Sequence, residues 1–201
     1  MFPPWAPFFP CSRPASHCCA EQVPLRDALG SRHGETVIYA VVLAAGASSR
    51  YGVEPPKQRE LLPSVLEALR TSTSLDGILV VLGAHDVETD EPTVRCADWE
   101  LGPGASLRCG LADLGDDVEA ALVVLADGPD LDPWAIDRVV ASWRAEGGDA
   151  VAAAYGGQRL HPVLLARVAW PLVPDEGARA LEARLVACDD LTPPGDVDVR
   201  R

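Results

Sequence analysis

The 201-residue sequence lacks long apolar runs and has few basic residues. No apolar run approaches the roughly 20 residues that a helix needs to span a bilayer. Lys and Arg number 17 against 30 Asp and Glu, which gives a formal net charge of −13. A protein that holds DNA or RNA by its phosphates needs clustered Lys and Arg. We therefore expect no membrane and no nucleic acid as partners, although one local cationic pocket could still hold a nucleotide.

Two common phosphate-binding signatures are also missing. The sequence contains neither the G-x-G-x-x-G of dinucleotide-binding folds nor the G-x-x-x-x-G-K-[ST] of P-loops. The cysteines beyond the N-terminal stretch, Cys96, Cys109 and Cys188, are scattered along the chain. Scattered cysteines are typical of reduced thiols, so we expect a cytoplasmic protein.

Residues 1–35 differ from the rest of the chain. They contain six of the eighteen prolines and all three phenylalanines, and they have no helical or strand period. Such a segment cannot easily join a sheet or a helix. We expect a disordered or loosely attached extension at residues 1–35, followed by one domain at residues 36–201.

The most informative stretch spans residues 37–57. Residues 37–43 are seven apolar residues without alternation, which predicts a strand buried on both faces in a parallel sheet. The next residues are small, so their backbone N–H groups can approach an anion, and Gly46 can take a positive φ. Arg50 and Lys57 then supply a planar guanidinium and a point charge for a polyphosphate. The alternative is a tight strand-to-helix turn with two surface cations.

A helix and a second strand follow this stretch. Apolar residues recur at helical spacing from Leu62 to Leu69, and Pro63 suits the first turn of that helix. Residues 77–83 form another continuous apolar run that ends in glycine, so a β-α-β unit is predicted. His85, just beyond this strand, could touch a ligand, but an exposed loop histidine near a carboxylate is the preferred interpretation.

A glycine-rich loop precedes the next helix. Gly102 and Gly104 predict the loop, and Ser106 is expected at the N-cap of a helix that continues through Leu107 and Leu111. A helix N-terminus with a free hydroxyl and a glycine-lined backbone can hold a phosphate, a ribose or a base. A plain capped helix start is the alternative.

The third predicted strand ends in an acidic residue. Residues 120–126 form another apolar run, and Asp127 follows it directly. Ligands of parallel sheets bind outside the carboxyl ends of the strands, where a carboxylate can bind Mg²⁺ together with phosphate oxygens and waters. Capping of the following helix is the alternative, which we prefer for Asp130 and Asp132. Residues 149–155 predict a fourth strand.

Several of these motifs resemble those of one protein family. L-A-A-G-A-S-S-R-Y-G at residues 43–52, followed by Lys57, resembles the signature of the MobA-like nucleotidyltransferases, in particular the molybdenum cofactor cytidylyltransferases. Residues 99–111 resemble the W-x-x-G-x-x-x-S-L-x-x-G-L segment of these cytidylyltransferases, and residues 125–131 resemble their L-A-D-x-P-x-L. Residues 161–163 are similar to their G-H-P-V, without the glycine.

The resemblance implies a fold and a reaction. The fold would be α/β, a three-layer Rossmann-like GT-A nucleotidyltransferase domain with a mostly parallel central sheet. The reaction would be Mg²⁺-dependent attack by an acceptor phosphate on the α-phosphate of an NTP, CTP by preference, with pyrophosphate leaving. The acceptor would be a phosphorylated pterin such as molybdopterin, and a molybdoenzyme would be the partner protein.

The resemblance also assigns roles to individual residues. Arg50 and Lys57 would hold the β- and γ-phosphates, and Asp127 would carry Mg²⁺ with Asp198 as a second ligand. His161 would contact the acceptor. The nucleotide would lie among residues from all of these motifs: Leu43, Ala44, Ala45, Gly46, Ser48, Arg50, Lys57, Gly102, Ser106 and Asp127.

Two alternative classes stay open. One is a transferase of the same fold with another acceptor, such as a sugar phosphate or a phospholactate, or with guanylyl transfer. The other is a non-catalytic chaperone that handles the cofactor of a molybdoenzyme. Four residues separate Gly52 from Lys57, where the family has two, so a reshaped phosphate loop is expected.

Overall fold

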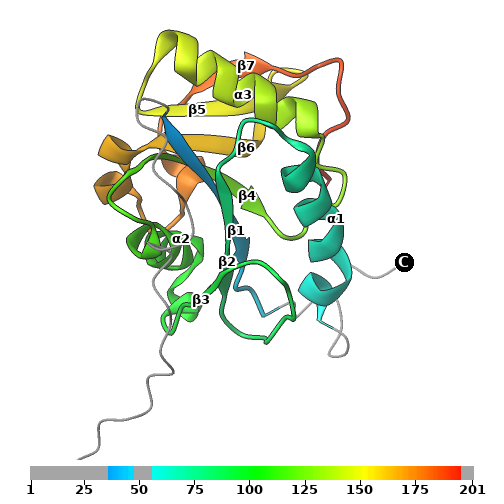
Figure 1. Cartoon of the computed structure of the whole chain (residues 1–201), viewed down its shortest axis with the longest axis vertical. Helices are drawn as coiled ribbons and strands as arrows, with labels where there is room; N and C mark the ends of the chain where they lie inside the picture. Colours follow the sequence, from blue (N-terminus) through cyan, green and yellow to red (C-terminus); the bar gives the residue numbers. More distant parts are fainter. Residues whose placement is uncertain (1–35, 48–55, 196–201) are drawn as a thin grey trace, which may run out of the picture. The chain divides into compact units, whose positions relative to one another are not determined.

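The computed structural model describes residues 36–47 and 56–195. Its helices and strands are interspersed along the chain, as expected of an α/β protein (Figure 1). None of the helices in these residues is long and apolar enough to cross a bilayer. In chain order the elements are β1 (Val37–Ala44), α1 (Lys57–Thr71), β2 (Gly77–Leu82), β3 (Thr93–Arg95), η2 (Trp99–Leu101), α2 (Pro103–Asp113), β4 (Val118–Leu125), α3 (Pro133–Glu146), β5 (Ala150–Tyr155), β6 (Gln158–Ala166), η3 (Arg167–Leu172), η4 (Ala178–Ala180) and β7 (Arg184–Ala187).

Seven strands form one sheet in the order β3-β2-β1-β4-β6-β5-β7. β1 lies between β2 and β4 and pairs parallel with both, and β2 pairs parallel with β3. β6 is antiparallel to both of its neighbours, β4 and β5, whereas β7 pairs parallel with β5. Only β6 runs against the other strands of this sheet, which confirms the predicted mostly parallel sheet.

The central strands are buried on both faces. Val41 and Val42 of β1 are successive residues that point to opposite faces, and both are fully buried, as are Leu122 and Val123 of β4. Parallel strands that are connected through covering helices need this continuous apolar pattern. The three unbroken apolar runs predicted as buried strands are β1, β2 and β4.

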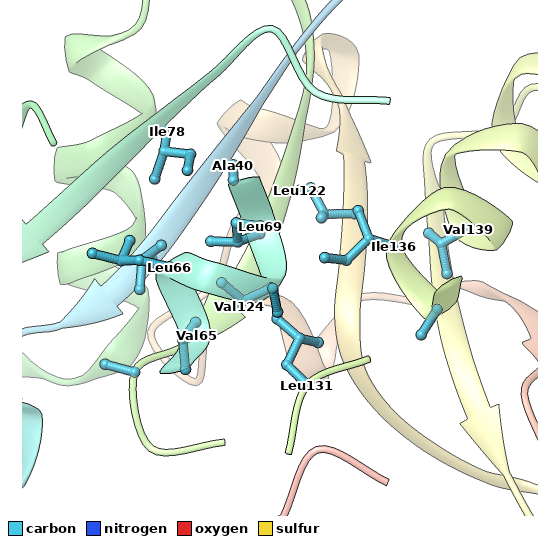
Figure 2. Close-up of a cluster of buried hydrophobic side chains, with 14 of the residues drawn as sticks. Ala40, Val65, Leu66, Leu69, Ile78, Leu122, Val124, Leu131, Ile136 and Val139 are labelled. Atoms are coloured by element: carbon cyan, nitrogen blue, oxygen red, sulfur yellow. The ribbon is translucent and has the colours of Figure 1, made fainter. Parts of the chain in front are cut away.

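Helices α1 and α3 cover one face of the sheet. Their apolar side chains pack against alternate residues of β1, β2 and β4 in a single hydrophobic cluster. Figure 2 shows part of this cluster, with Leu66 and Leu69 of α1 and Ile136 of α3 beside Ala40 and Leu122 of the sheet. The apolar residues whose helical spacing predicted α1 are therefore the ones that face the sheet.

Helix α2 covers the opposite face. Gly110 of α2 lies so close to the sheet that a Cβ at this position would meet Val81 Cγ2 at 2.6 Å and Val41 Cγ1 at 2.9 Å. In Figure 1, α1 and α2 lie on the two sides of β1 and β2. Helices on both faces of one sheet give the three layers that the sequence predicts.

Two predicted helix starts are wrong. α1 begins at Lys57, six residues before Pro63, which lies inside the helix instead of in its first turn. Pro63 removes one backbone N–H from the helix, but the buried face of α1 supplies enough packing to tolerate that loss. α2 begins at Pro103 with Gly102 at the N-cap, so Ser106 is a helical residue and not the cap. Proline at the first helical position is favoured because the missing N–H would have no partner there.

Three strands were not predicted. β3 has three residues and β7 has four, and each alternates between exposed and less exposed side chains. β6 begins with four exposed or half-buried residues before its buried half at residues 162–166. Short or half-exposed strands carry little apolar signal, so their pairing with neighbours decides that they form.

We expect Leu69→Ala to lower the free energy of unfolding by about 2 to 5 kcal/mol, because it leaves a cavity in the cluster under α1. Leu69 is 1% exposed. The matched control is Leu172→Ala, since Leu172 is 62% exposed and should cost less than about 0.5 kcal/mol. Chemical denaturation of the two variants compares them, and equal losses would contradict the packing described here.

Candidate active site

A pocket of about 320 Å³ opens at the carboxyl ends of β1 and β4. This is the edge at which open α/β sheets bind their ligands. Residues from the loop after β1, the start of α1, the start of α2 and the end of β4 line the pocket together. They are Leu43, Ala45, Gly46, Lys57, Gln58, Trp99, Glu100, Gly102, Pro103, Ser106, Leu125, Ala126 and Asp127.

The loop after β1 forms one wall of this pocket. Residues 45–47 are small, and Gly46 and Ala47 are exposed. Gly46 is absent from the described glycines that have a positive φ, so the loop does not use the conformation that glycine would permit here. Among the described residues, a Cβ at Gly46 would meet only Gln58 Nε2, at 3.8 Å, which is an ordinary contact. Small size, rather than backbone freedom, lets this loop approach a ligand.

Lys57 and Asp127 form an ion pair inside the pocket. Lys57 Nζ lies 2.9 Å from Asp127 Oδ2, and the exposed fractions of the side chains are 8% and 32%. Lys57 is the first residue of α1 and Asp127 follows β4, so parallel pairing of β1 with β4 brings the two ends together. Lys57 is also the only lysine in the chain. A cation and a carboxylate of this kind can serve a bound polyphosphate and its metal ion.

The start of α2 forms the opposite wall. Gly104 N–H donates to Asp175 O at 2.9 Å, and a Cβ at Gly104 would lie 1.9 Å from Pro174 O. Arg108 donates to Asp175 Oδ1 at 2.8 Å, which ties the same segment to α2. Ser106 is 3% exposed and lines the pocket. Glycine at residue 104 therefore allows the segment around Asp175 to pack directly on the helix that carries Ser106.

Comparison with known proteins identifies the family. Residues 40–187 match the MobA-like NTP transferase domain. The chain belongs to this family. The family prediction from the motifs is therefore confirmed over nearly all of the described part of the chain.

Curated relatives of the MobA-like domain carry another specific name. A 2-C-methyl-D-erythritol 4-phosphate cytidylyltransferase from Dechloromonas aromatica is 37% identical over 110 residues, which cover 49% of this chain and 44% of that protein. A protein of the same name from Azoarcus sp. is 35% identical over 130 residues, covering 56% and 54% of the two chains. The chain thus spans about half the length of these curated relatives. Neither name refers to the molybdenum cofactor, so the narrower resemblance stays a prediction.

The fold of the MobA-like domain also occurs in a solved structure, that of Rv0371c from Mycobacterium tuberculosis. The two proteins superpose with a TM-score of 0.68 at 25% sequence identity. The match covers 82% of this chain and 94% of that one. Together with the sheet order, this match confirms the Rossmann-like fold class.

Asp127 fits a divalent metal ion as a single protein ligand. Mg²⁺ is usually held by one or two carboxylates, with phosphate oxygens and waters completing its coordination. In residues 36–47 and 56–195 no three His, Cys, Asp or Glu side chains cluster around a metal position. Asp198, the predicted second ligand, lies outside the described residues. The described chain ends at Gly195 beside the loop that carries Asp127, because Asp130 N–H donates to Pro194 O at 3.1 Å.

His161 lies on β6, next to the end of β4, and does not line the pocket. Its Nδ1 lies 3.1 Å from Val123 O, and because a carbonyl only accepts, Nδ1 carries the hydrogen. Burial lowers the pKa of His161, although this hydrogen bond and the nearby Asp127 oppose the shift. The ring is therefore neutral at neutral pH, and the acceptor-binding role of His161 stays a prediction.

The structure brings together most of the predicted nucleotide-binding residues. Ala44 does not line the pocket, because its side chain is buried in the cluster under α1. Ser48 and Arg50 lie outside the described residues. His85, interpreted as a plain loop residue, contacts the loop after β1, with Nε2 2.9 Å from Ala47 O.

Sequence reasoning missed Gln58. This residue is 6% exposed, lines the pocket and donates from Nε2 to Gly46 O at 2.7 Å. Its position directly after Lys57 was the available signal, but Gln58 precedes Pro63, which was predicted to lie in the first turn of α1. Glu100 and Pro103 also line the pocket without having been predicted.

The two acidic residues predicted as caps behave differently. Asp132 is the N-cap of α3 and accepts from Trp134 N–H at 2.9 Å, whereas Asp130 makes no such bond to α3 within the described residues.

We expect Asp132→Ala to lower the free energy of unfolding by about 0.5 to 2 kcal/mol, because it removes the N-cap of α3. Asp130→Ala is the control that should change it less. Thermal unfolding measures both, and an equal loss would remove the cap assignment.

Proposed function

We propose that the MobA-like domain is a nucleotidyltransferase that moves a nucleoside monophosphate from an NTP, CTP by preference, to a phosphorylated acceptor. The ion pair of Lys57 and Asp127 in the pocket is the observation that carries this proposal. Family membership supports the same reaction class. The names of the curated relatives support CTP as the donor.

The reaction needs positioning and charge neutralisation and no protein nucleophile. An oxygen of the acceptor phosphate attacks the α-phosphorus of the NTP, the bond from that phosphorus to the bridging oxygen breaks, and pyrophosphate leaves with the electron pair. The Lys57 ammonium, whose side chain is largely shielded from water, neutralises phosphate charge. Asp127 would hold the divalent ion, which when bound supplies further neutralisation of phosphate charge. Arg50 is assigned to the same phosphates by its motif alone.

The acceptor is the open part of this proposal. The curated relatives are named for 2-C-methyl-D-erythritol 4-phosphate. The L-A-A-G and H-P-V motifs instead resemble those of enzymes that act on molybdopterin. Both acceptors present a phosphomonoester, so the same pocket chemistry serves either one, and we propose to test them side by side.

Pyrophosphate release should be measured with each of the four NTPs, with either acceptor, and with or without Mg²⁺. We expect release with CTP in the presence of one acceptor and the metal ion, and background release without them. Binding can be followed separately, because CTP should protect Lys57, the only lysine, from an amine-reactive reagent. Protection without pyrophosphate release from any combination would favour the non-catalytic alternative.

Lys57→Ala should lower kcat/KM by about 30- to 1,000-fold, which corresponds to about 2 to 4 kcal/mol of transition-state stabilisation. Asp127→Asn should reduce turnover comparably, because it keeps the shape of the side chain and removes its charge. Arg70→Ala is the control, since Arg70 forms an exposed ion pair with Glu91 away from the pocket. A normal kcat/KM for Lys57→Ala would show that its ammonium does not act on the triphosphate.

A further inference from the structure

The loop of residues 45–47 has all three of its carbonyl oxygens bound by other parts of the chain. Ala45 O accepts from Ala84 N–H at 3.0 Å. Gly46 O accepts from Gln58 Nε2 at 2.7 Å, and Ala47 O lies 2.9 Å from His85 Nε2. Because a carbonyl oxygen only accepts, His85 must carry a hydrogen on Nε2. Donors from α1 and from the segment after β2 thus hold three consecutive carbonyls.

The direction of these carbonyls determines what the loop offers to an anion. A carbonyl oxygen near a phosphate repels it, whereas an N–H group binds it. The peptide unit is planar and trans, so its C=O and N–H point in opposite directions. Holding Ala45 O and Gly46 O therefore fixes the directions of the Gly46 and Ala47 N–H groups. Within residues 36–47 and 56–195, no hydrogen bond occupies either of these two N–H groups.

Gln58 is the donor best placed to act on the site. Its side chain is 6% exposed, and both Gln58 and Gly46 line the pocket. An interior amide is costly to leave unpaired, so its hydrogen bond to Gly46 O is a firm link between the loop and α1. The preceding residue, Lys57, carries the cation of the pocket. The start of α1 therefore carries two groups of the site. These are the Lys57 ammonium and the Gln58 amide that holds the peptide between Gly46 and Ala47.

We propose that Gln58, assisted by His85, is a positioning residue for the triphosphate of the NTP. Gln58 holds the Gly46 carbonyl away from the phosphates and thereby directs the Ala47 N–H toward a phosphate oxygen, and His85 keeps the Ala47 carbonyl away from the same phosphates. The Gly46 N–H, which the hydrogen bond from Ala84 N–H to Ala45 O directs, binds phosphate beside it. This inference rests on the proposed function, because it needs a polyphosphate in the pocket. It assigns neither residue a direct contact with the nucleotide.

The test is calorimetric binding of inorganic tripolyphosphate and of CTP to the full chain, with Mg²⁺. Gln58→Leu keeps much of the bulk but cannot donate, so we expect about three- to tenfold weaker binding of both probes, as for the loss of one hydrogen bond. Gln58→Glu should bind more weakly still, because its carboxylate cannot donate when ionised and adds negative charge. Gln158→Leu is the matched control, since Gln158 is exposed at the start of β6.

His85 gives a second pair of variants that should fold normally, because this residue is only partly buried. His85→Ala should weaken tripolyphosphate binding, and His85→Gln should restore it, since a glutamine amide can place a donor near the position of Nε2. Unchanged affinities in both Gln58→Leu and His85→Ala, whatever their melting temperatures, would overturn the positioning role. Failure of the unaltered protein to bind either probe would instead overturn the proposed function, and this inference with it.

Discussion

Parallel pairing of β1 with β4 is the constraint on which the candidate site depends. It places the carboxyl ends of both strands at one edge of the sheet, where the loop of residues 45–47 meets Asp127. The connection from β1 to β2 passes through α1, whose first residue, Lys57, returns to the same edge. An ammonium and a carboxylate that are 70 residues apart in the chain can then lie within 2.9 Å of each other. Without this pairing, the Lys57 ammonium and the Asp127 carboxylate would not meet.

The strongly acidic chain has few cations, and one of them lies in the pocket. The only lysine is almost fully buried in the pocket, whereas ion pairs of Arg70, Arg108 and Arg138 lie at more exposed positions. A net charge of −13 repels polyanions at long range, so a phosphate ligand must be bound by local groups. In the function proposed here, Lys57 and the N–H groups of the loop would meet that requirement at short range, where the direction of each donor matters most.

The predictions succeeded where a motif or an apolar run is continuous in the chain. The strands β1, β2 and β4 were predicted because helices cover both of their faces, and the family was predicted from its consecutive motifs. Predictions failed at element boundaries. The start of α1 was misplaced because Pro63 is a strong local signal for a first turn, yet packing of Leu66 and Leu69 keeps it inside the helix. Ser106 was predicted as a cap from its residue type, although Pro103 starts the helix one turn earlier.

The sequence by itself determined which apolar runs form buried strands, the family and the residue types that a phosphate site needs, because these are properties of short, contiguous stretches. Only the tertiary structure decided which of these residues meet. It paired Lys57 with Asp127, moved Ala44 into the core, and brought Gln58 and His85 onto the carbonyls of one loop. These contacts join segments that are distant in the chain, and no local pattern specifies the distance or direction between them. Sheet pairing and helix packing specify both.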